Sequence, residues 1–142
     1  MPRVDFYILP GTDTMDRLLF CCRLTEKAYT LGHRVFIRTH DPAETSIIDD
    51  MLWTFRQGSF IPHGGRQSKE ATPPPVLVDH RYDEQDEFEL LINLSEELPP
   101  TGQQFERIAE IINQDAALKQ QGRAHYRQYQ QQDYEVQHHQ MK

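Results

Sequence analysis

The chain has 142 residues, of which 37% are hydrophobic and 26% are charged, and its formal net charge at pH 7 is −7. This length suits one domain with a single core, and no apolar run approaches the roughly 20 residues of a membrane span. The acidic balance disfavours strong direct binding to nucleic acid, because the protein as a whole repels phosphate groups. The amino-terminal residues show no signal-peptide pattern, so we expect a cytoplasmic protein.

The first part of the chain predicts a strand–helix–strand unit. Residues 4–9 are apolar and aromatic and run into a Pro-Gly pair, as a strand that enters a turn does. Thr12 or Asp13 can cap a helix that ends at Gly32, and residues 33–38 are the second predicted strand. Strands joined in this way are nearly always parallel. The helix is expected to bury Met15, Leu18, Leu19, Cys22, Ala28 and Tyr29.

A second helix is predicted to open at Asp41 and Pro42, since proline tolerates the first helical position. At ~100° per residue, Trp53 falls nearly opposite the centre of its apolar stripe. Two interpretations stay open: Trp53 is an exposed contact residue, or the helix frays and the ring folds back onto the core. The stripe consists of Ile47, Ile48, Met51, Leu52 and Phe55.

The middle of the chain alternates short strands with polar connections. Residues 59–63 predict an edge strand, because the proline at position 62 cannot donate a ladder hydrogen bond. Residues 64–75 are a loop by composition and end in three prolines, and residues 76–78 are the third core strand. Residues 83–89 form an acidic connector that precedes a fourth buried strand at residues 90–94.

The last part of the chain is predicted to be helical. One helix is expected to bury Phe105, Ile108, Ala109 and Ile112. A second helix spans residues 115–132, and residues 133–142 are expected to form a frayed tail. One face of this second helix is shared by Leu118, Gly122, His125 and Tyr129. Residues 1–132 therefore predict a single three-layer α/β domain, with a mostly parallel central sheet and helices on both faces.

Patterns that carry catalysis are not found in the sequence. It contains no phosphate-binding glycine motif, no nucleophile elbow, and no pair of histidines at the helical spacing of a metal site. Cys21 and Cys22 are adjacent in a predicted helix, so they form no disulfide or metal pair, and we expect one buried and one half-buried thiol. We therefore predict no catalytic residue, no cofactor and no metal. The alternative is a small nucleotide-binding or nucleotide-modifying α/β enzyme.

A row of cations marks the last predicted helix. Lys119, Arg123 and Arg127 recur every four residues and so lie along one line, with Tyr126 beside them. One interpretation is a solvated helix surface. The other is a binding site for an acidic peptide or a carboxylate, with an aromatic wall that can contact an apolar side chain.

Three blocks of residues resemble one family. These are V-D-F-Y-I-L at residues 4–9, L-W-x-F with S-F-I-P-H within residues 52–63, and L-K-x-x-x-R-x-x-Y-R at residues 118–127. Together they resemble the chi subunit of bacterial DNA polymerase III over nearly the whole chain, and the loop at residues 64–75 is the least similar part. The resemblance implies a Rossmann-like fold without a catalytic role in the clamp-loader assembly.

The resemblance also implies two protein contacts, and from the lack of a long apolar run we expect no membrane contact. The first is to the acidic, phenylalanine-ending tail of single-stranded DNA-binding protein, and it falls on Lys119, Arg123, Tyr126, Arg127, Trp53 and Ile112. The second is to the psi subunit in a 1:1 heterodimer, or to a helicase that competes for the same surface. It centres on Phe60, flanked by Pro62 and His63. Arg127 stands where a lysine is familiar in the family, and His125 replaces a more basic residue.

Overall fold

The computed structural model describes residues 3–55, 61–65, 74–81, 88–99 and 105–142. Its strands are β1 (Arg3–Ile8), β2 (Val35–Arg38), β3 (His63–Gly64), β4 (Val76–Asp79), β5 (Leu90–Asn93), β6 (Arg107–Ile112) and β7 (Glu135–Gln140), and its helices are α1 (Thr14–Thr30), α2 (Pro42–Thr54) and α3 (Ala116–Gln131). The strands form one sheet in the order β3-β4-β2-β5-β6-β1-β7, and all of the described pairs are parallel.

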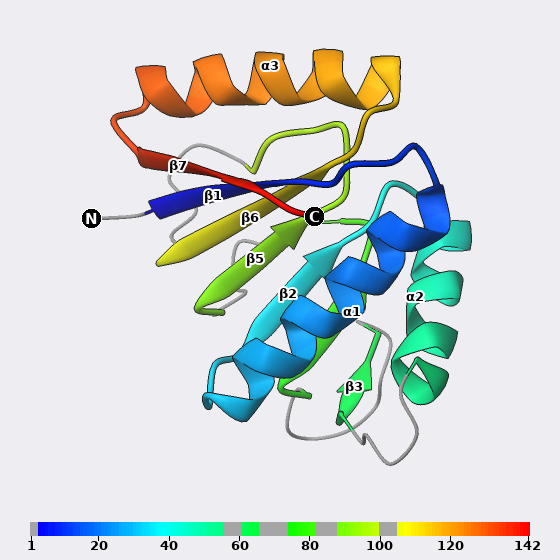
Figure 1. Ribbon diagram of the computed structural model, residues 1–142. Helices are drawn as coiled ribbons and strands as arrows, with labels where there is room; N and C mark the ends of the chain where they lie inside the picture. The colour runs from blue at the N-terminus through cyan, green and yellow to red at the C-terminus, as the bar shows by residue number, and fades with distance from the viewer. Residues whose placement is uncertain (1–2, 56–60, 66–73, 82–87, 100–104) are drawn as a thin grey trace.

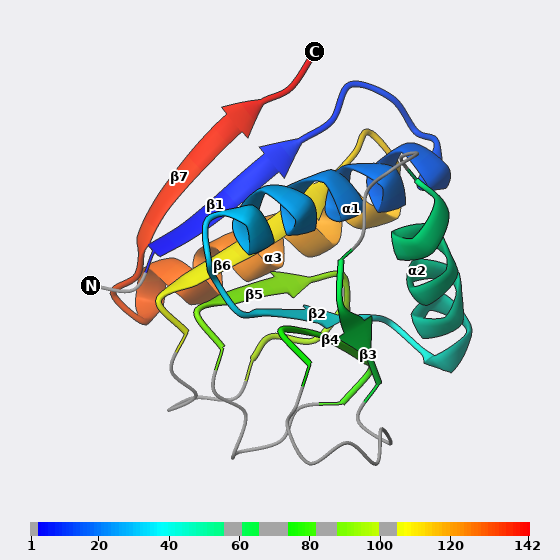
Figure 2. The same cartoon turned by 90° about the horizontal axis from the view of Figure 1, so that it is seen from below.

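The elements form three layers, as predicted. Helices α1 and α2 cover one face of the sheet, and α3 lies on the other face, where it contacts β6 and β7 (Figure 1). The view from below shows α1 in front of the strands, α3 behind β6, and α2 at the side of the sheet next to β3 (Figure 2). Each described helix is too short or too polar to span a lipid bilayer.

An aspartate caps the start of α1, α2 and α3. The sequence predicts Asp115 as a cap and a helix that opens at Asp41, and it leaves Thr12 and Asp13 as alternatives for α1. The three carboxylates accept hydrogen bonds from backbone N–H groups in the first turn: Asp13 from Met15 at 2.9 Å, Asp41 from Glu44 at 2.8 Å, and Asp115 from Leu118 at 3.1 Å. Such caps satisfy donors that have no partner within the helix. At the other end of α1, Gly32 has a φ of +88°, a conformation that glycine adopts without steric cost.

The face covered by α1 and α2 has an aliphatic core, with departures from the expected burial at its margins. Met15 is 52% exposed because it lies in the first turn of α1, and Ile47 on α2 is 43% exposed. Both Cys21 and Cys22 are buried, whereas one half-buried thiol was expected. Burial raises the pKa of Cys22 to about 12, so this thiol is protonated and unreactive at neutral pH.

The prediction of a helix through Ile108 and Ile112 is wrong, because these residues belong to strand β6. The strand lies between β5 and β1 and is buried on both faces. Ile108 packs against the α3 side of the sheet, whereas Ala109 and Ile111 pack against the α1 side. Central strands of parallel sheets are apolar on both faces, so their sequences also fit a helical spacing over one or two turns.

The prediction of a frayed tail at residues 133–142 is also wrong, because Glu135–Gln140 forms the edge strand β7. The chain leaves α3 through Asp133, whose φ of 63° lies in the left-handed region. It then pairs with β1 along its whole length, from Arg3 opposite Glu135 to Ile8 opposite Gln140. Backbone pairing holds this strand in place together with its two histidines, since His138 stacks on Phe6 and His139 stacks on Tyr7.

Candidate functional site

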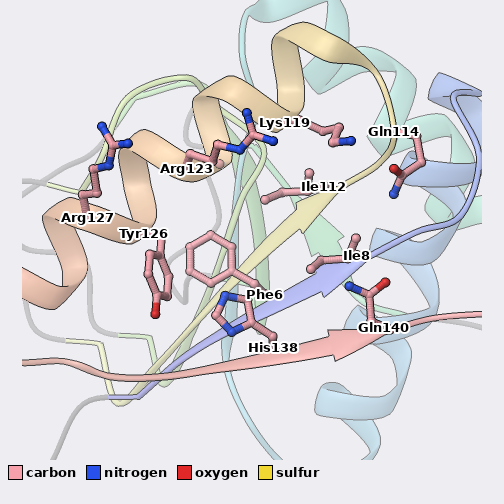
Figure 3. Close-up of a pocket in the computed structure, with 11 residues that line it drawn as sticks. Phe6, Ile8, Ile112, Gln114, Lys119, Arg123, Tyr126, Arg127, His138 and Gln140 are labelled. Atoms are coloured by element: carbon pink, nitrogen blue, oxygen red, sulfur yellow. The ribbon is translucent and has the colours of Figure 1, made fainter.

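A pocket of about 520 Å³ lies between α3 and the strands β1, β6 and β7. We call it the α3 pocket. Its floor is apolar and consists of Phe6 and Ile8 on β1 with Ile112 on β6. Helix α3 forms one wall and β7 forms the other (Figure 3). Residues from opposite ends of the chain therefore meet in this site.

The wall on α3 carries the predicted row of cations. Lys119, Arg123 and Arg127 all line the pocket, and no acidic residue is among its described lining residues. None of the three forms an ion pair with a carboxylate in the described part of the chain. In a protein with a net charge of −7, this wall is a local concentration of unneutralised positive charge.

Three rings pack together at one end of the α3 pocket. The ring of His138 on β7 stacks on Phe6 with centroids 5.6 Å apart, and it lies 4.9 Å from the ring of Tyr126. Phe6 and Tyr126 meet edge to face at 5.9 Å. This packing leaves Phe6 only 1% exposed, so at this end the floor is already covered by protein.

Gly122 lets α3 approach the floor of the pocket closely. A Cβ atom at this position would lie 2.2 Å from Cδ1 of Ile112, which is too close for two carbon atoms. The missing side chain therefore leaves Ile112 its place in the floor. The sequence predicts Gly122 on the buried face of the helix, and this is confirmed.

A buried polar network joins α3 to the sheet beneath it. The carboxylate of Glu110 on β6 accepts hydrogen bonds from the hydroxyl of Tyr129 at 2.7 Å and from the amide of Asn93 at 2.8 Å. Its other oxygen lies 3.0 Å from Nδ1 of His125, whose Nε2 lies 2.8 Å from the carbonyl oxygen of Glu96. Both partners of the imidazole are acceptors, so the doubly protonated ring satisfies the site and forms an ion pair with Glu110.

The environment of His125 agrees with this assignment. Burial on its own lowers the pKa of His125, but the hydrogen bond and the negative charge of Glu110, with the carbonyl of Glu96, raise it overall. His125 faces the sheet and does not line the α3 pocket. The difference at His125 that the family resemblance implies therefore affects the buried contact between α3 and the sheet. It does not change the charge of the pocket wall.

Most of the residues predicted for the first contact lie together. Lys119, Arg123, Tyr126 and Arg127 line the α3 pocket, and Ile112 forms part of its floor. The sequence did not indicate the other lining residues, because the floor and the β7 wall of the pocket form only when the three strands β1, β6 and β7 pair. These further lining residues are Phe6, Ile8, Gln114, His138 and Gln140.

Trp53 is not brought to the α3 pocket. It lies on α2, which covers the opposite face of the sheet, and it is 51% exposed. The outward direction predicted from helical phase is therefore confirmed, but its grouping with the cations on α3 is not. Its ring lies 4.6 Å from that of His63, a residue predicted for the second contact.

His63 is held firmly beside Trp53. Its Nδ1 lies 2.6 Å from the carbonyl oxygen of Ile61, and its Nε2 lies 3.2 Å from that of Asp49 on α2. Pro62 is half-buried in the same segment. Phe60, the centre of the predicted second contact, lies outside the described residues.

The arrangement suits recognition of an anion that carries an apolar group. Three cations can neutralise carboxylates, and the neighbouring floor can take an apolar side chain. Nowhere in the described ranges do three His, Cys, Asp or Glu side chains gather as metal ligands do.

Comparisons with known proteins point to one family. A profile of the family described as "DNA polymerase III chi subunit, HolC" matches residues 1–137. The chain is 38% identical over 141 residues to the DNA polymerase III subunit chi of Pseudomonas aeruginosa, covering 99% of this chain and 98% of that protein. It is 32% identical to the subunit chi of Haemophilus influenzae, over 87% of each chain, and 24% identical to that of Escherichia coli, over 91% of each. The chain belongs to the DNA polymerase III chi subunit family, whose members are accessory, non-catalytic subunits of the replicative polymerase.

Proposed function

We propose that this chain is an adaptor that binds the acidic tail of single-stranded DNA-binding protein in the α3 pocket and links it to the clamp loader during cytoplasmic DNA replication. The observation that carries the proposal is the row of three unneutralised cations beside an apolar floor, in a protein whose net charge is −7. An acidic peptide that ends in phenylalanine matches both features.

The physical chemistry of this contact indicates a modest affinity. Carboxylates of the tail accept charge-assisted hydrogen bonds from Lys119, Arg123 and Arg127, while the terminal ring removes apolar surface from water. A short peptide held in this way is expected to bind with a Kd around micromolar, or about 8 kcal/mol. Several tails on one DNA-coated assembly raise the effective affinity, and added salt lowers it.

The surface around Trp53 is proposed as the second contact, with a psi subunit in a 1:1 heterodimer or with a helicase that competes for it. Its support is an exposed tryptophan packed on His63, with Pro62 alongside. Tryptophan is among the residues that most often dominate the binding energy of protein interfaces. Because Trp53 lies away from the α3 pocket, we assign it to this surface.

The first contact is tested with Arg123→Ala. Loss of one charge-assisted hydrogen bond is expected to weaken binding of a synthetic acidic, phenylalanine-ending peptide by about tenfold or more. The free energy of unfolding should change by less than about 0.5 kcal/mol, because the side chain is exposed. Isothermal titration calorimetry measures the affinity, and Arg23→Ala on the exposed side of α1 is the matched control.

An unchanged affinity for Arg123→Ala would contradict the assignment of the α3 pocket. A thermal-shift screen with nucleotides and divalent metals separates the rival activity. Stabilisation of the wild-type protein by a nucleotide, without stabilisation by the peptide, would favour a nucleotide-binding protein instead.

The second contact is tested with Phe60→Ala and Trp53→Ala. Both variants are expected to lose capture of a purified psi subunit in a pull-down assay while they keep the wild-type affinity for the peptide. Ile47→Ala, which removes another exposed apolar side chain from α2, serves as the control. Loss of peptide binding together with loss of psi capture would mean that these two side chains stabilise the fold instead of contacting psi.

A further inference from the structure

Strand β7 forms one edge of the sheet, and its outer side is open. It pairs with β1 and packs against α3, and no other described strand pairs with it. The view from below shows β7 as the outermost ribbon on its side of the molecule (Figure 2). An open edge presents backbone N–H and C=O groups with which a strand of another chain can pair.

The usual protection of an exposed edge is missing from β7. Lysine, proline or a β-bulge normally keeps strands of other chains away from such an edge. Residues Glu135–Gln140 include neither lysine nor proline, and their register with β1 runs without a bulge. With neutral histidines, the strand carries one charge, on Glu135 at its start. Strand β7 therefore combines an open edge with little electrostatic repulsion.

The backbone hydrogen bonds show which residues of β7 point outward. The N–H of Met141 donates to the carbonyl oxygen of Ile8 on β1 at 2.9 Å. In a parallel ladder the N–H and C=O of one residue point to the same neighbouring strand, and those of the next residue point the other way. The odd-numbered residues of β7 therefore bond to β1, and the outward groups belong to Val136, His138 and Gln140.

These three residues match a second copy of the same strand. In an antiparallel pair, two residues directly opposite each other exchange both hydrogen bonds or none, so outward residues must face outward residues. The antiparallel register that pairs all three sets Val136 of one copy opposite Gln140 of the other, and His138 opposite His138. Every outward N–H and C=O of the three residues then has a partner.

The side chains are compatible with this register. Glu135 of one copy lies opposite Met141 of the other, and Tyr134 lies opposite Lys142. Like charges directly opposite each other would destabilise the pair, and with neutral histidines this register contains none. A lysine beside a tyrosine ring is a favourable cation–π contact.

We propose that β7 pairs with β7 of a second copy of this chain, in an antiparallel register centred on His138, so that two sheets join into one. The two copies are then related by a twofold axis perpendicular to the joined sheet, which places both α3 helices and both α3 pockets on the same face. Strand β3, whose His63 packs on Trp53, is the opposite edge of the sheet. Pairing through β7 therefore leaves the surface around Trp53 uncovered.

The dimer is tested by analytical ultracentrifugation of the wild type, Val136→Pro and Val136→Ala. Proline removes an outward N–H and leaves the bonds to β1 in place, so it should abolish a concentration-dependent dimer that the wild type forms. Alanine keeps this N–H and should keep the dimer. Circular dichroism verifies that each variant is folded. A wild-type protein that stays monomeric up to its highest soluble concentration would overturn the proposal, and so would proline and alanine variants that behave alike.

The register is tested by disulfide trapping, which does not depend on the proline variant. Glu135→Cys and Met141→Cys chains are mixed under mild oxidation. The two new thiols face each other in the proposed register, so the mixture should form a disulfide-linked dimer. In Glu135→Cys alone the thiols lie about 20 Å apart, six residues along the strand, and should form none. The native Cys21 and Cys22 are buried and do not compete. A mixture that crosslinks no faster than Glu135→Cys alone would overturn the proposed pairing.

Discussion

The two faces of the sheet are built from different chemistry. The face under α1 and α2 is packed with aliphatic side chains such as Ile37, Ile48 and Leu52, all at most 1% exposed. The face under α3 holds aromatic rings and the ion pair between Glu110 and His125. Two helices cover the first face, whereas one helix covers the second and leaves the α3 pocket beside it. The aliphatic core and the α3 pocket thus lie on opposite faces of the sheet.

This separation has a physical reason. Aliphatic packing is non-directional, and it stabilises the fold roughly in proportion to the apolar surface area removed from water. A hydrogen-bonded ion pair instead fixes α3 in one position relative to β6. This position keeps the row of cations on α3 beside the apolar floor of the α3 pocket. Substitutions on each face test how independent the two faces are.

The largest effect is expected from Glu110→Ala. It removes the partner of a buried imidazolium at His125 and takes one hydrogen-bond acceptor each from Tyr129 and Asn93, so it should destabilise the protein by about 3–5 kcal/mol. Urea denaturation measures this loss. Glu106→Ala removes an exposed carboxylate just before the same strand and should change stability by less than about 0.5 kcal/mol. Similar values for the two variants would mean that the network does not hold α3.

Leu52→Ala tests the aliphatic face. The cavity left by a fully buried leucine should cost about 2–5 kcal/mol, whereas Ile47→Ala on the exposed side of α2 should cost far less. The folded fraction of Leu52→Ala should bind the acidic peptide as the wild type does, because Leu52 lies on the opposite face of the sheet. A tenfold loss of peptide affinity in this variant would show that the two faces are coupled.

Gly122→Ala tests the close approach of α3 to the pocket floor. The new methyl group forces Ile112 to move, at a cost of about 1–3 kcal/mol, and better helix propensity offsets about 1 kcal/mol of this. Peptide binding should weaken severalfold as Ile112 shifts into the pocket. In an Ile112→Val background, which lacks the clashing Cδ1 atom, the stability cost should largely vanish. A cost that persists there would place the strain elsewhere.

The smallest effect is a dependence of stability on pH. The folded-state pKa of His125 is raised, so the stability that it contributes is fully present below its ordinary pKa near 6.5 and is lost as the pH rises through the raised value. The difference in unfolding free energy between the wild type and His125→Gln should therefore shrink as the pH increases from about 6. A difference that grows with pH would reverse the assigned protonation.

Local features of the fold could be predicted from the sequence because they depend on neighbouring residues. The caps Asp41 and Asp115 lie directly before their helices, and the spacing of Lys119, Arg123 and Arg127 places them on one line of any helix. The family resemblance pointed to the same residues. The structure confirms that the three cations lie on one helix, and the partner that they bind is proposed.

The mistaken predictions involve strands whose place depends on distant residues. Ile108 and Ile112 fit a helical spacing, and only the buried position between β5 and β1 makes their segment a strand. Residues 135–140 lack the apolar alternation of a strand, and they are ordered by the open edge of β1 and by the stacking of His138 and His139 on its aromatic rings. Periodicity describes a side-chain pattern, whereas pairing in a parallel sheet is decided by backbone partners far along the chain.

The sequence by itself therefore determined the helix caps, the buried face of α3 and the line of cations, because all three are set within a few turns of one helix. Only the tertiary structure decided what faces those cations. The row of Ile112, Ile8 and Gln140 exists because three parallel strands meet in one register. The same topology places Trp53 on the opposite face, since helix phase gives a direction but not a neighbour.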